Sequence, residues 1–425
     1  MFSTFVTKLF SDEQSTTASK STVHGGYKHI VVSGNPYERG YSHGQQAKDK
    51  ICTNIRQYST SSSLPPKEIC SHYVQKVYLP AIESLFPEGL DEMKGIADGA
   101  CVMLDDIILL NARYDLSRVK YSPEASPNPV GECTSMAYVQ DSEVGKVSDQ
   151  VYVAQNWDMS PWLHDLDTII ILESHNTDAD GIGQPSVIIS LTEAGQLARS
   201  GLNSCGLGLC ANSLWSAEDF SPHTPEYEGK SFLPFTLARR MFLECGNFSA
   251  GLKALSTFPR HVSGNIMVGS HTGLAMNFEL SPSAYFALHP TPLSIDSSAV
   301  LLTHANHFTG AYGIKDTYPG GSSLFRDVRL FSLLRNVKKH VVKSKPGLKA
   351  GLGITDLRMV FGDHAGFPRS LCEHADKGRQ KYGAATSNTM TVASVIYDLS
   401  KLEMHVCKGN PCCGTWQTYS ISRKQ

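Results

Sequence analysis

Residues 131–138, Gly-Glu-Cys-Thr-Ser-Met-Ala-Tyr (GECTSMAY), directly follow YSPEASPNPV at 121–130. Those ten preceding residues contain three prolines, which exclude a regular helix or a central strand, so we expect a loop. From Cys133 to Val139 the residues are apolar or β-branched, which predicts a short strand. A cysteine that begins a strand behind a flexible loop suits a nucleophile released by self-cleavage of the chain. A buried structural cysteine fits the same pattern, and the rest of the sequence must decide between them.

The chain changes character at this loop. Before it, a strand is expected at 27–32 and helices at 36–52, 67–86 and 104–116. After it, strands are expected at 133–139, 151–155, 168–173, 186–191, 265–268 and 275–280, with a closing hairpin of 389–397 and 402–406. Helices are expected at 234–245, 249–256 and 323–342, the last with Leu324, Val328, Phe331 and Leu334 on one side. Strands in runs and helices in runs favour an α+β fold over alternating βαβ units.

Composition narrows the classes of protein further. The chain has 425 residues, of which 38 are basic and 40 acidic, giving a net charge of −2. This balance gives no electrostatic case for binding nucleic acid or an anionic membrane. Apolar residues make up 41% and charged residues 18%, which is typical of a chain with a large core. No apolar run approaches the length of about 18 residues that a membrane span needs.

The cysteine content and the chain ends indicate the cellular compartment of the protein. Eleven cysteines, scattered and odd in number, indicate reduced thiols in an intracellular protein rather than a disulfide framework. The N-terminal MFSTFVTKLF lacks the continuous apolar segment of a secretory signal. We therefore predict a cytoplasmic protein. A peroxisomal location is the alternative, although the final residues, ISRKQ, are not a Ser-Lys-Leu tail.

Three short motifs have simpler structural interpretations. Gly40–Gly44 (GYSHG) matches the G-x-S-x-G nucleophile elbow, but it lies within a helical pattern, so we interpret its glycines as sites of close helix packing. Gly206-Leu207-Gly208 lacks the strand–turn–helix context of a dinucleotide site. Cys407, Cys412 and Cys413, or Cys372 with His374, are candidate zinc ligands, but neither group has a second pair at ligand spacing. We therefore expect no metal and no cofactor.

Several segments together resemble the isopenicillin-N acyltransferase family, a group of N-terminal-nucleophile hydrolases (peptidase family C45). The resemblance spans about residues 27–420, and the order of the segments also matches. The matching segments are RGYSHG (39–44), LNARYDL (110–116), ECTSMAY (132–138), AQNWDM (154–159), TEAGQLARSGLNSCGLGLCANSL (192–214), THANHF (303–308), DHAGFPRSLCEH (363–374) and TVASVIYDLSKLEMHV (391–406).

The resemblance implies an αββα sandwich of two stacked antiparallel sheets. Residues 1–26 are then a flexible arm, 27–132 a mainly helical segment and 133–425 a strand-rich segment, and the last two form one domain. The family's activity implies a self-processing cysteine amidohydrolase or acyltransferase that acts on small amides, peptides or acyl-CoA thioesters. Its cleaved fragments are expected to stay associated as a heterodimer, with no nucleic-acid or membrane partner.

The resemblance also assigns roles to residues. Cys133 is the nucleophile, and cleavage is expected between Glu132 and Cys133. Asp158, in QNWD, is expected to orient the new α-amine and the thiol. Asn265, in VSGNIM, matches an oxyanion donor, and Arg326, in SSLFRDVR, matches a site arginine. Arg329 is the alternative arginine, and Asn156 and Asn203 lie in matching segments that also have a purely structural interpretation.

One position departs from the family pattern. The residue before the nucleophile is often glycine there, whereas this chain has Glu132. A carboxylate beside the thiol is expected to raise the thiol pKa by like-charge repulsion, and it could slow self-cleavage or serve as a local base. The alternative to an enzyme is therefore an uncleaved relative that acts as a binding module. The sequence does not separate hydrolysis from transfer to an amine.

Overall fold

The computed structural model describes residues 25–60, 64–120, 131–140, 150–179, 183–222, 225–293, 298–310, 313–344, 351–375 and 389–422, with only the backbone of 338–344. The predicted loop at 121–130 and all but the last two residues of the predicted arm at 1–26 lie outside these ranges. No helix within them is both long enough and apolar enough to cross a lipid bilayer.

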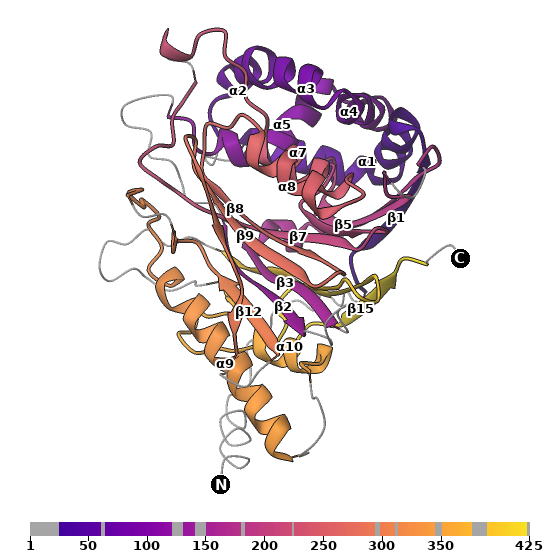
Figure 1. Ribbon diagram of the computed structural model, residues 1–425. Helices are drawn as coiled ribbons and strands as arrows, with labels where there is room; N and C mark the ends of the chain where they lie inside the picture. The colour runs from indigo at the N-terminus through magenta and orange to yellow at the C-terminus, as the bar shows by residue number, and fades with distance from the viewer. Residues whose placement is uncertain are drawn as a thin grey trace, which may run out of the picture.

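Two β-sheets are stacked face to face, with helices on both outer faces (Figure 1). The eight-stranded sheet has the order β1-β4-β5-β6-β7-β8-β9-β10, and all its pairs are antiparallel except β1 with β4. Its strands are β1 (Lys28–Gly34), β4 (Ile169–Asn176), β5 (Val187–Glu193), β6 (Ser200–Asn203), β7 (Leu207–Ser213), β8 (Gly264–Ser270), β9 (Leu274–Leu280) and β10 (Tyr285–Leu288).

The seven-stranded sheet is antiparallel throughout, in the order β11-β12-β2-β3-β13-β14-β15. Its two central neighbours, β2 and β3, contain the segments ECTSMAY and AQNWDM. Its strands are β11 (Thr291–Pro292), β12 (Ala299–His304), β2 (Glu132–Gln140), β3 (Gln150–Met159), β13 (Met390–Asp398), β14 (Glu403–Lys408) and β15 (Trp416–Ser420).

The helices fall into two groups. Those over the eight-stranded sheet are α1 (Pro36–Thr60), α2 (Lys67–Tyr73), α3 (Leu79–Leu85), α4 (Pro87–Ala100), α5 (Leu104–Leu116), α7 (Phe235–Leu243) and α8 (Phe248–Thr257). Those on the other outer face are α9 (Ser323–Ser344) and α10 (Ile354–Phe361). Short helical turns lie at Trp162–Asp165 (α6) and Pro225–Tyr227 (η2). The expected αββα sandwich is therefore confirmed.

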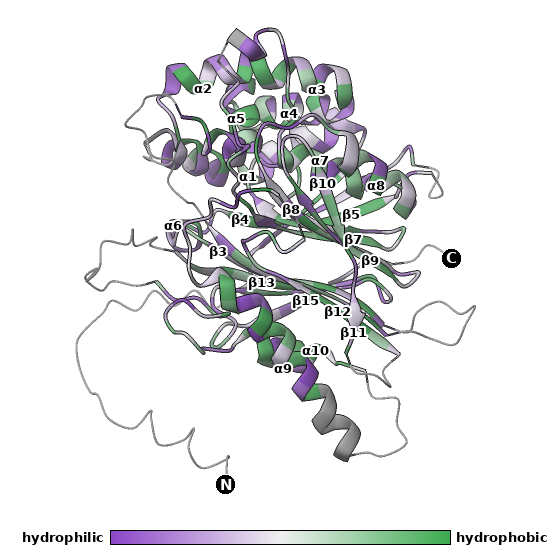
Figure 2. Ribbon diagram, turned by 60° about the vertical axis from the view of Figure 1, so that its left-hand side comes forward, coloured by the Kyte–Doolittle hydropathy of each residue, from purple (hydrophilic) through white to green (hydrophobic). Residues whose placement is uncertain are grey.

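The apolar core is divided among the three interfaces between these four layers (Figure 2). Strand β2 is buried along its whole length, including its polar residues Glu132, Thr134, Ser135 and Gln140. Because side chains alternate along a strand, Cys133 and Ala137 face the space between the sheets, whereas Met136 and Tyr138 face α9 and α10. Because of this alternation, the side chains of Glu132 and Cys133 lie in different surroundings on opposite faces of β2.

Two helical predictions differ in detail from the structure. The stretch expected at 67–86 is helical, but a π-helical turn at Val74–Tyr78 lies between α2 and α3. Pro80 lacks an N–H and cannot continue the hydrogen-bond ladder through the first turn of α3. In α9, Phe331 and Leu334 pack on the core as predicted, but Leu324 and Val328 are 67% and 61% exposed, so the predicted face is wrong in the first half of the helix. The buried side instead contains Arg326, because that guanidinium reaches the start of β2.

Helices α1 and α4 cross unusually closely. A Cβ atom added at Gly40 would lie 1.9 Å from the carbonyl oxygen of Glu92, and one at Gly44 would lie 2.4 Å from that of Ile96. Gly95 and Gly99 of α4 make the reciprocal approach to the backbone of α1. The interpretation of GYSHG as a packing motif is thereby confirmed, and Ser42 lies within a helix rather than on a nucleophile elbow.

We expect Gly40→Ala to destabilise the protein, because the methyl group would meet backbone rather than a movable side chain. Overpacking of this kind costs about 1–3 kcal/mol. The measurement is the free energy of unfolding from a denaturant titration. Gly25→Ala, where nothing lies within 4 Å of the added Cβ, is the control and should leave stability unchanged. Equal stability of the two variants would contradict the close crossing.

Candidate active site

Cys133 lies near the start of β2, opposite Trp157 of β3, and is 2% exposed. Its Sγ atom lies 3.3 Å from a guanidinium nitrogen of Arg199. That guanidinium stacks over the Trp157 ring at 4.0 Å and also donates to Gln155 Oε1 at 3.2 Å. Burial raises the pKa of the thiol, while Arg199 acts in the opposite direction by favouring the thiolate. The arrangement thus provides a cationic partner for a buried thiolate.

The backbone of Cys133 is held from the side of α9. Its N–H donates to Asn306 Oδ1 at 2.9 Å, and its carbonyl oxygen accepts from Arg326 at 2.7 Å. Asn306 is itself fixed, since its Nδ2 donates to the Ser213 carbonyl at 3.0 Å. A free α-amine at Cys133 would therefore find an acceptor already in place at Asn306.

Arg326 holds Glu132 as well. Its guanidinium lies 2.9 Å from Glu132 Oε2 and 2.8 Å from Asn306 Oδ1, and its side chain is 0% exposed. Ser322 Oγ donates to the same Glu132 oxygen at 2.6 Å. Although burial alone would raise it, the pKa of the Glu132 carboxyl is lowered, because Arg326 and Ser322 stabilise the charged form.

The structure changes the interpretation of Glu132. Its carboxylate lies on the α9 side of β2 and is neutralised by Arg326, whereas the thiol lies on the opposite face. Burial and then Asp158, rather than Glu132, raise the thiol pKa. The choice between the two arginines is also clear in the geometry. Arg329 pairs instead with Asp363, with its side chain 39% exposed.

Asp158 lies on β3 directly opposite Glu132 and is 0% exposed. Its Oδ1 accepts from Thr391 Oγ1 at 2.6 Å, and within the described residues its Oδ2 has no hydrogen-bond partner. Burial, and then the nearby Glu373 carboxylate, raise the pKa of Asp158 well above its usual value. Asp158 is thus a buried acid beside the Glu132–Cys133 junction.

Glu373 is the second acid of this cluster. It accepts hydrogen bonds from Arg369 at 2.6 Å and from Thr389 at 2.5 Å. Burial, followed by repulsion from Glu132, raises its pKa to about 7. Three carboxyl groups therefore share two arginines on the α9 side of the sheet, and the group can hold a proton near neutral pH.

Asn265 is 1% exposed on β8 and lines a narrow cavity of about 30 Å³ together with Arg199, Asn212 and Arg239. Its Nδ2 donates to Asn277 Oδ1 at 2.7 Å and to the Phe278 carbonyl at 3.2 Å. Both amide protons are therefore engaged within the eight-stranded sheet. Burial, followed by repulsion from Arg199, lowers the pKa of Arg239 to about 9, so the cavity is strongly electropositive.

The other two asparagines of the matching segments have structural contacts. Asn156 donates to the carbonyls of Phe361 and Leu371, at 2.9 and 2.7 Å. Asn203 donates to those of Leu243 and Cys245, at 2.8 and 2.9 Å. Their structural interpretation fits these contacts.

The sequence analysis did not single out Arg199, Asn306 or Glu373. Each lies in a matching segment, yet none has a local pattern that distinguishes it. An arginine or glutamate among small and apolar residues is a useful signal, because a buried charge needs a partner. The partners are distant in sequence, and only the fold reveals them.

Fold and site together form an αββα sandwich with a strand-starting cysteine beside a buried acid, which is the arrangement that the resemblance implies. No family model matches the chain. The chain is 23% identical over 399 residues to the acyl-coenzyme A:6-aminopenicillanic-acid-acyltransferase 40 kDa form of Emericella nidulans, covering 90% of this chain and 93% of that relative. The resemblance to the isopenicillin-N acyltransferase family, and with it the expectation of an enzyme, is confirmed.

Solved structures give weaker similarities. Penicillin V acylase from Agrobacterium tumefaciens has a TM-score of 0.41 and 11% identity, with 68% of this chain and 87% of that chain covered. A mutant of conjugated bile acid hydrolase from Clostridium perfringens has a TM-score of 0.36 and 11% identity, with 68% and 97% covered. The fold described above follows from the two sheets of this chain.

Replacing Arg199 should raise the pKa of the Cys133 thiol, because the thiolate loses its nearest cation. For Arg199→Met we expect the pH profile of iodoacetamide labelling at Cys133 to shift upward relative to the unmodified protein. At pH 7 labelling should be slower, since a smaller fraction is thiolate. Mass spectrometry of peptides measures the extent of iodoacetamide labelling at Cys133 at each pH. Arg329→Met is the control and should leave the profile in place, whereas an unshifted profile in Arg199→Met would contradict the contact.

Proposed function

We propose that this chain is a self-processing cysteine enzyme that cleaves or transfers acyl groups of small amides, peptides or acyl-CoA thioesters through Cys133. The observation that carries the proposal is the position of Cys133, whose N–H donates to Asn306 while its thiol lies against Arg199. A nucleophile and the nitrogen that would become its base are thus held by separate partners. The similarity to an acyltransferase supports the same reaction class.

Maturation would proceed by an N-to-S acyl shift. The Cys133 thiol attacks the Glu132 carbonyl carbon, a thioester forms, and the Glu132–Cys133 C–N bond breaks as the nitrogen takes a proton. Water then hydrolyses the thioester, which restores the thiol and leaves Glu132 with a new α-carboxylate. In this scheme Arg326, which contacts both residues, keeps the junction in place during the reaction.

Turnover would use the new α-amine as the base. Its reference pKa of about 7.7–8.0 leaves a neutral fraction near pH 7. The amine accepts the thiol proton, the thiolate attacks the substrate carbonyl, and the leaving group departs with that proton. Water or an amine then attacks the thioester, which decides between hydrolysis and acyl transfer. Asn306 and Asp158 would orient the amine, and Arg199 would stabilise the thiolate.

The oxyanion of the tetrahedral intermediate needs fixed donors. We assign Asn265 to this role, as the resemblance implies, and it shares a cavity with Arg199. Its Nδ2 donates to Asn277 in the continuous chain, so the assignment requires the amide to turn toward the thiol. Arg199 is the second candidate donor, because it already reaches Sγ.

The two fragments would remain together after cleavage. Strand β1, which precedes the cleavage point, pairs with β4, which follows it, over seven residue pairs from Lys28–Ile170 to Gly34–Asn176. The helices α1 to α5 also share one apolar cluster with residues from β4 to β9. Residues 1–132 and 133–425 would then form a heterodimer with a continuous core. No observation favours the alternative of a binding module over an enzyme.

The first expected outcome is cleavage between Glu132 and Cys133. The intact mass of the purified protein should show two fragments, 1–132 and 133–425, that elute together in gel filtration. Cys133→Ala should remain one chain, because no thiol is present to attack. Cys210→Ala, which removes another buried thiol, is the control and should cleave. An active protein that stays a single chain would overturn the proposal.

The second expected outcome separates Asp158 from Asn265. Asp158→Asn should slow both cleavage and turnover, because in the proposal Asp158 orients the thiol and the Cys133 nitrogen, which is the scissile amide in cleavage and the α-amine in turnover. Asn265→Ala should cleave but lose about 10²–10³ in kcat, the usual cost of one oxyanion donor. Melting curves paired with kinetics on an activated thioester provide the measurement. If Asn265→Ala melts much earlier while its folded fraction turns over normally, Asn265 is structural.

A further inference from the structure

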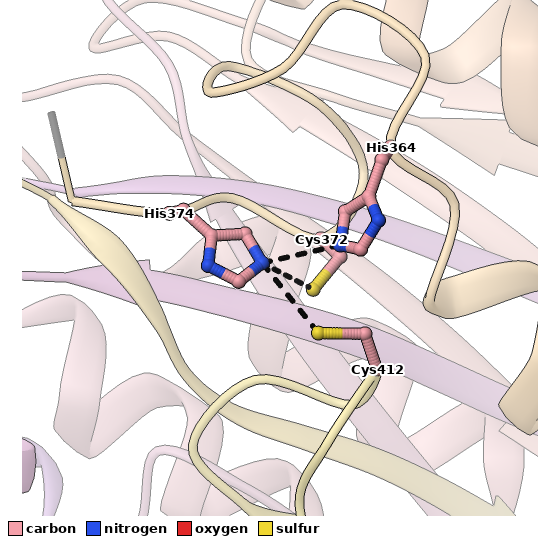
Figure 3. A group of neighbouring side chains, drawn as sticks. All are labelled: His364, Cys372, His374 and Cys412. Atoms are coloured by element: carbon pink, nitrogen blue, oxygen red, sulfur yellow. Dashed lines mark hydrogen bonds between the residues drawn. The ribbon is translucent and has the colours of Figure 1, made fainter. Parts of the chain in front are cut away.

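Four potential metal ligands converge where the segment after α10 meets the turn between β14 and β15 (Figure 3). His364, Cys372 and His374 come from the segment that follows α10, and Cys412 comes from the turn between β14 and β15. Their ligand atoms all lie within 4.8 Å of one another. The structure thus joins the Cys372–His374 pair, noted in the sequence, to His364 and to the more distant Cys412.

The three separations from His374 match those of a tetrahedral zinc site. His374 Nε2 lies 3.1 Å from His364 Nε2, 3.5 Å from Cys372 Sγ and 3.5 Å from Cys412 Sγ. Bond lengths of about 2.0–2.1 Å for Zn–N and about 2.3 Å for Zn–S place tetrahedral ligands about 3.3 Å (N···N) and about 3.6 Å (N···S) apart. The observed separations agree to within a few tenths of an ångström.

Hydrogen bonding accounts poorly for this convergence. One ring nitrogen of His374 faces another imidazole nitrogen and two thiols, yet it can take part in only one or two good hydrogen bonds. An ion at the centre would replace all three contacts with bonds to itself. Two imidazoles and two thiolates favour zinc over magnesium or calcium, which prefer oxygen ligands.

We propose that His364, Cys372, His374 and Cys412 bind one zinc ion. Four protein ligands close the coordination sphere, so the ion is structural rather than catalytic. The proposal replaces the expectation that the chain uses no metal. It also changes the candidate ligand set, because Cys407 and Cys413 lie against backbone carbonyls of residues 408 and 410 instead of joining the quartet.

The site would connect two segments beside the buried acids. Cys372 and His374 flank Glu373, whose backbone N–H donates to Thr391 Oγ1 at 2.9 Å. Thr391 Oγ1 in turn donates to Asp158 Oδ1 at 2.6 Å. From the other segment, Asn410 Nδ2 donates to the Glu373 carbonyl at 2.6 Å. The ion would therefore fix the backbone on which the partner of Asp158 depends.

Metal content is measured on the full-length Cys133→Ala protein, purified in reducing buffer and dialysed against zinc sulfate and then against metal-free buffer. This variant neither cleaves nor turns over under the proposed function, so the result is independent of that proposal. We expect one zinc per chain by mass spectrometry of the metal. Replacement by cobalt should give the intense visible absorption of a tetrahedral thiolate site.

Cys412→Ser and His364→Ala should lower zinc affinity by at least tenfold in competition with a chromogenic chelator. Cys413→Ser is the matched control, since Cys413 is an exposed neighbour outside the quartet, and it should bind like the parent protein. Zinc that is absent from the parent, or retained equally by all three variants, would overturn the proposal. A Cys372–Cys412 disulfide, found by peptide mapping of the protein purified in reducing buffer, would also overturn the proposed zinc site.

The structural role has its own readout. Chelation should lower the melting temperature of the Cys133→Ala protein, and added zinc should restore it. Cys412→His, which supplies another zinc ligand, should retain the ion and the higher melting temperature, whereas Cys412→Ser should lose both. A melting temperature that does not respond to chelation of bound zinc would contradict a structural ion.

Discussion

The site depends on the hydrogen bonds and the ion pair that the buried guanidinium of Arg326 makes. This guanidinium contacts the Glu132 carboxylate, the Cys133 carbonyl, the Thr134 hydroxyl and the Asn306 amide, so one cation fixes both sides of a single peptide bond. A buried charge of this kind is costly to desolvate and is retained only when its hydrogen bonds are satisfied. Here these four contacts all lie at or beside the start of β2. Removing the arginine would leave Glu132 buried without its counter-charge.

Strand β2 places the Cys133 thiol and the Glu132 carboxylate on opposite faces of the sheet. Its alternation sends the thiol into the space between the sheets, toward Arg199, and sends the carboxylate of Glu132 outward, toward Asp158 and Glu373. The thiol therefore lies on the face away from the Glu132 carboxylate, although the nearby Asp158 still raises the thiol pKa. The backbone N–H and carbonyl of Cys133 instead bond to Asn306 and Arg326 on the α9 side. The proposed α-amine would thus link the two halves of the site.

Sequence periodicity located most elements, since β2, β3, α5 and the closing hairpin match their predicted ranges within a few residues. It failed for the first half of α9, where Leu324 and Val328 are exposed because Arg326 takes the buried side. The resemblance already implied roles for Cys133, Asp158 and Arg326, and the structure places all three at the start of β2. Arg199 and Asn306 were not singled out, because their contacts with Cys133 join segments 66 and 173 residues apart.

The parallel pairing of β1 with β4 affects how the protein can refold before and after cleavage. In a continuous chain the two strands are covalently tethered, and refolding is a unimolecular event. For a chain cut at Cys133, the same pairing becomes an association of two polypeptides whose rate falls with dilution. Neither fragment carries a complete core, because the apolar cluster under the helices draws on both. Cleavage would then make folding harder to reverse. The active form would persist while it stays folded, but once unfolded its two fragments would refold less readily than the uncleaved chain.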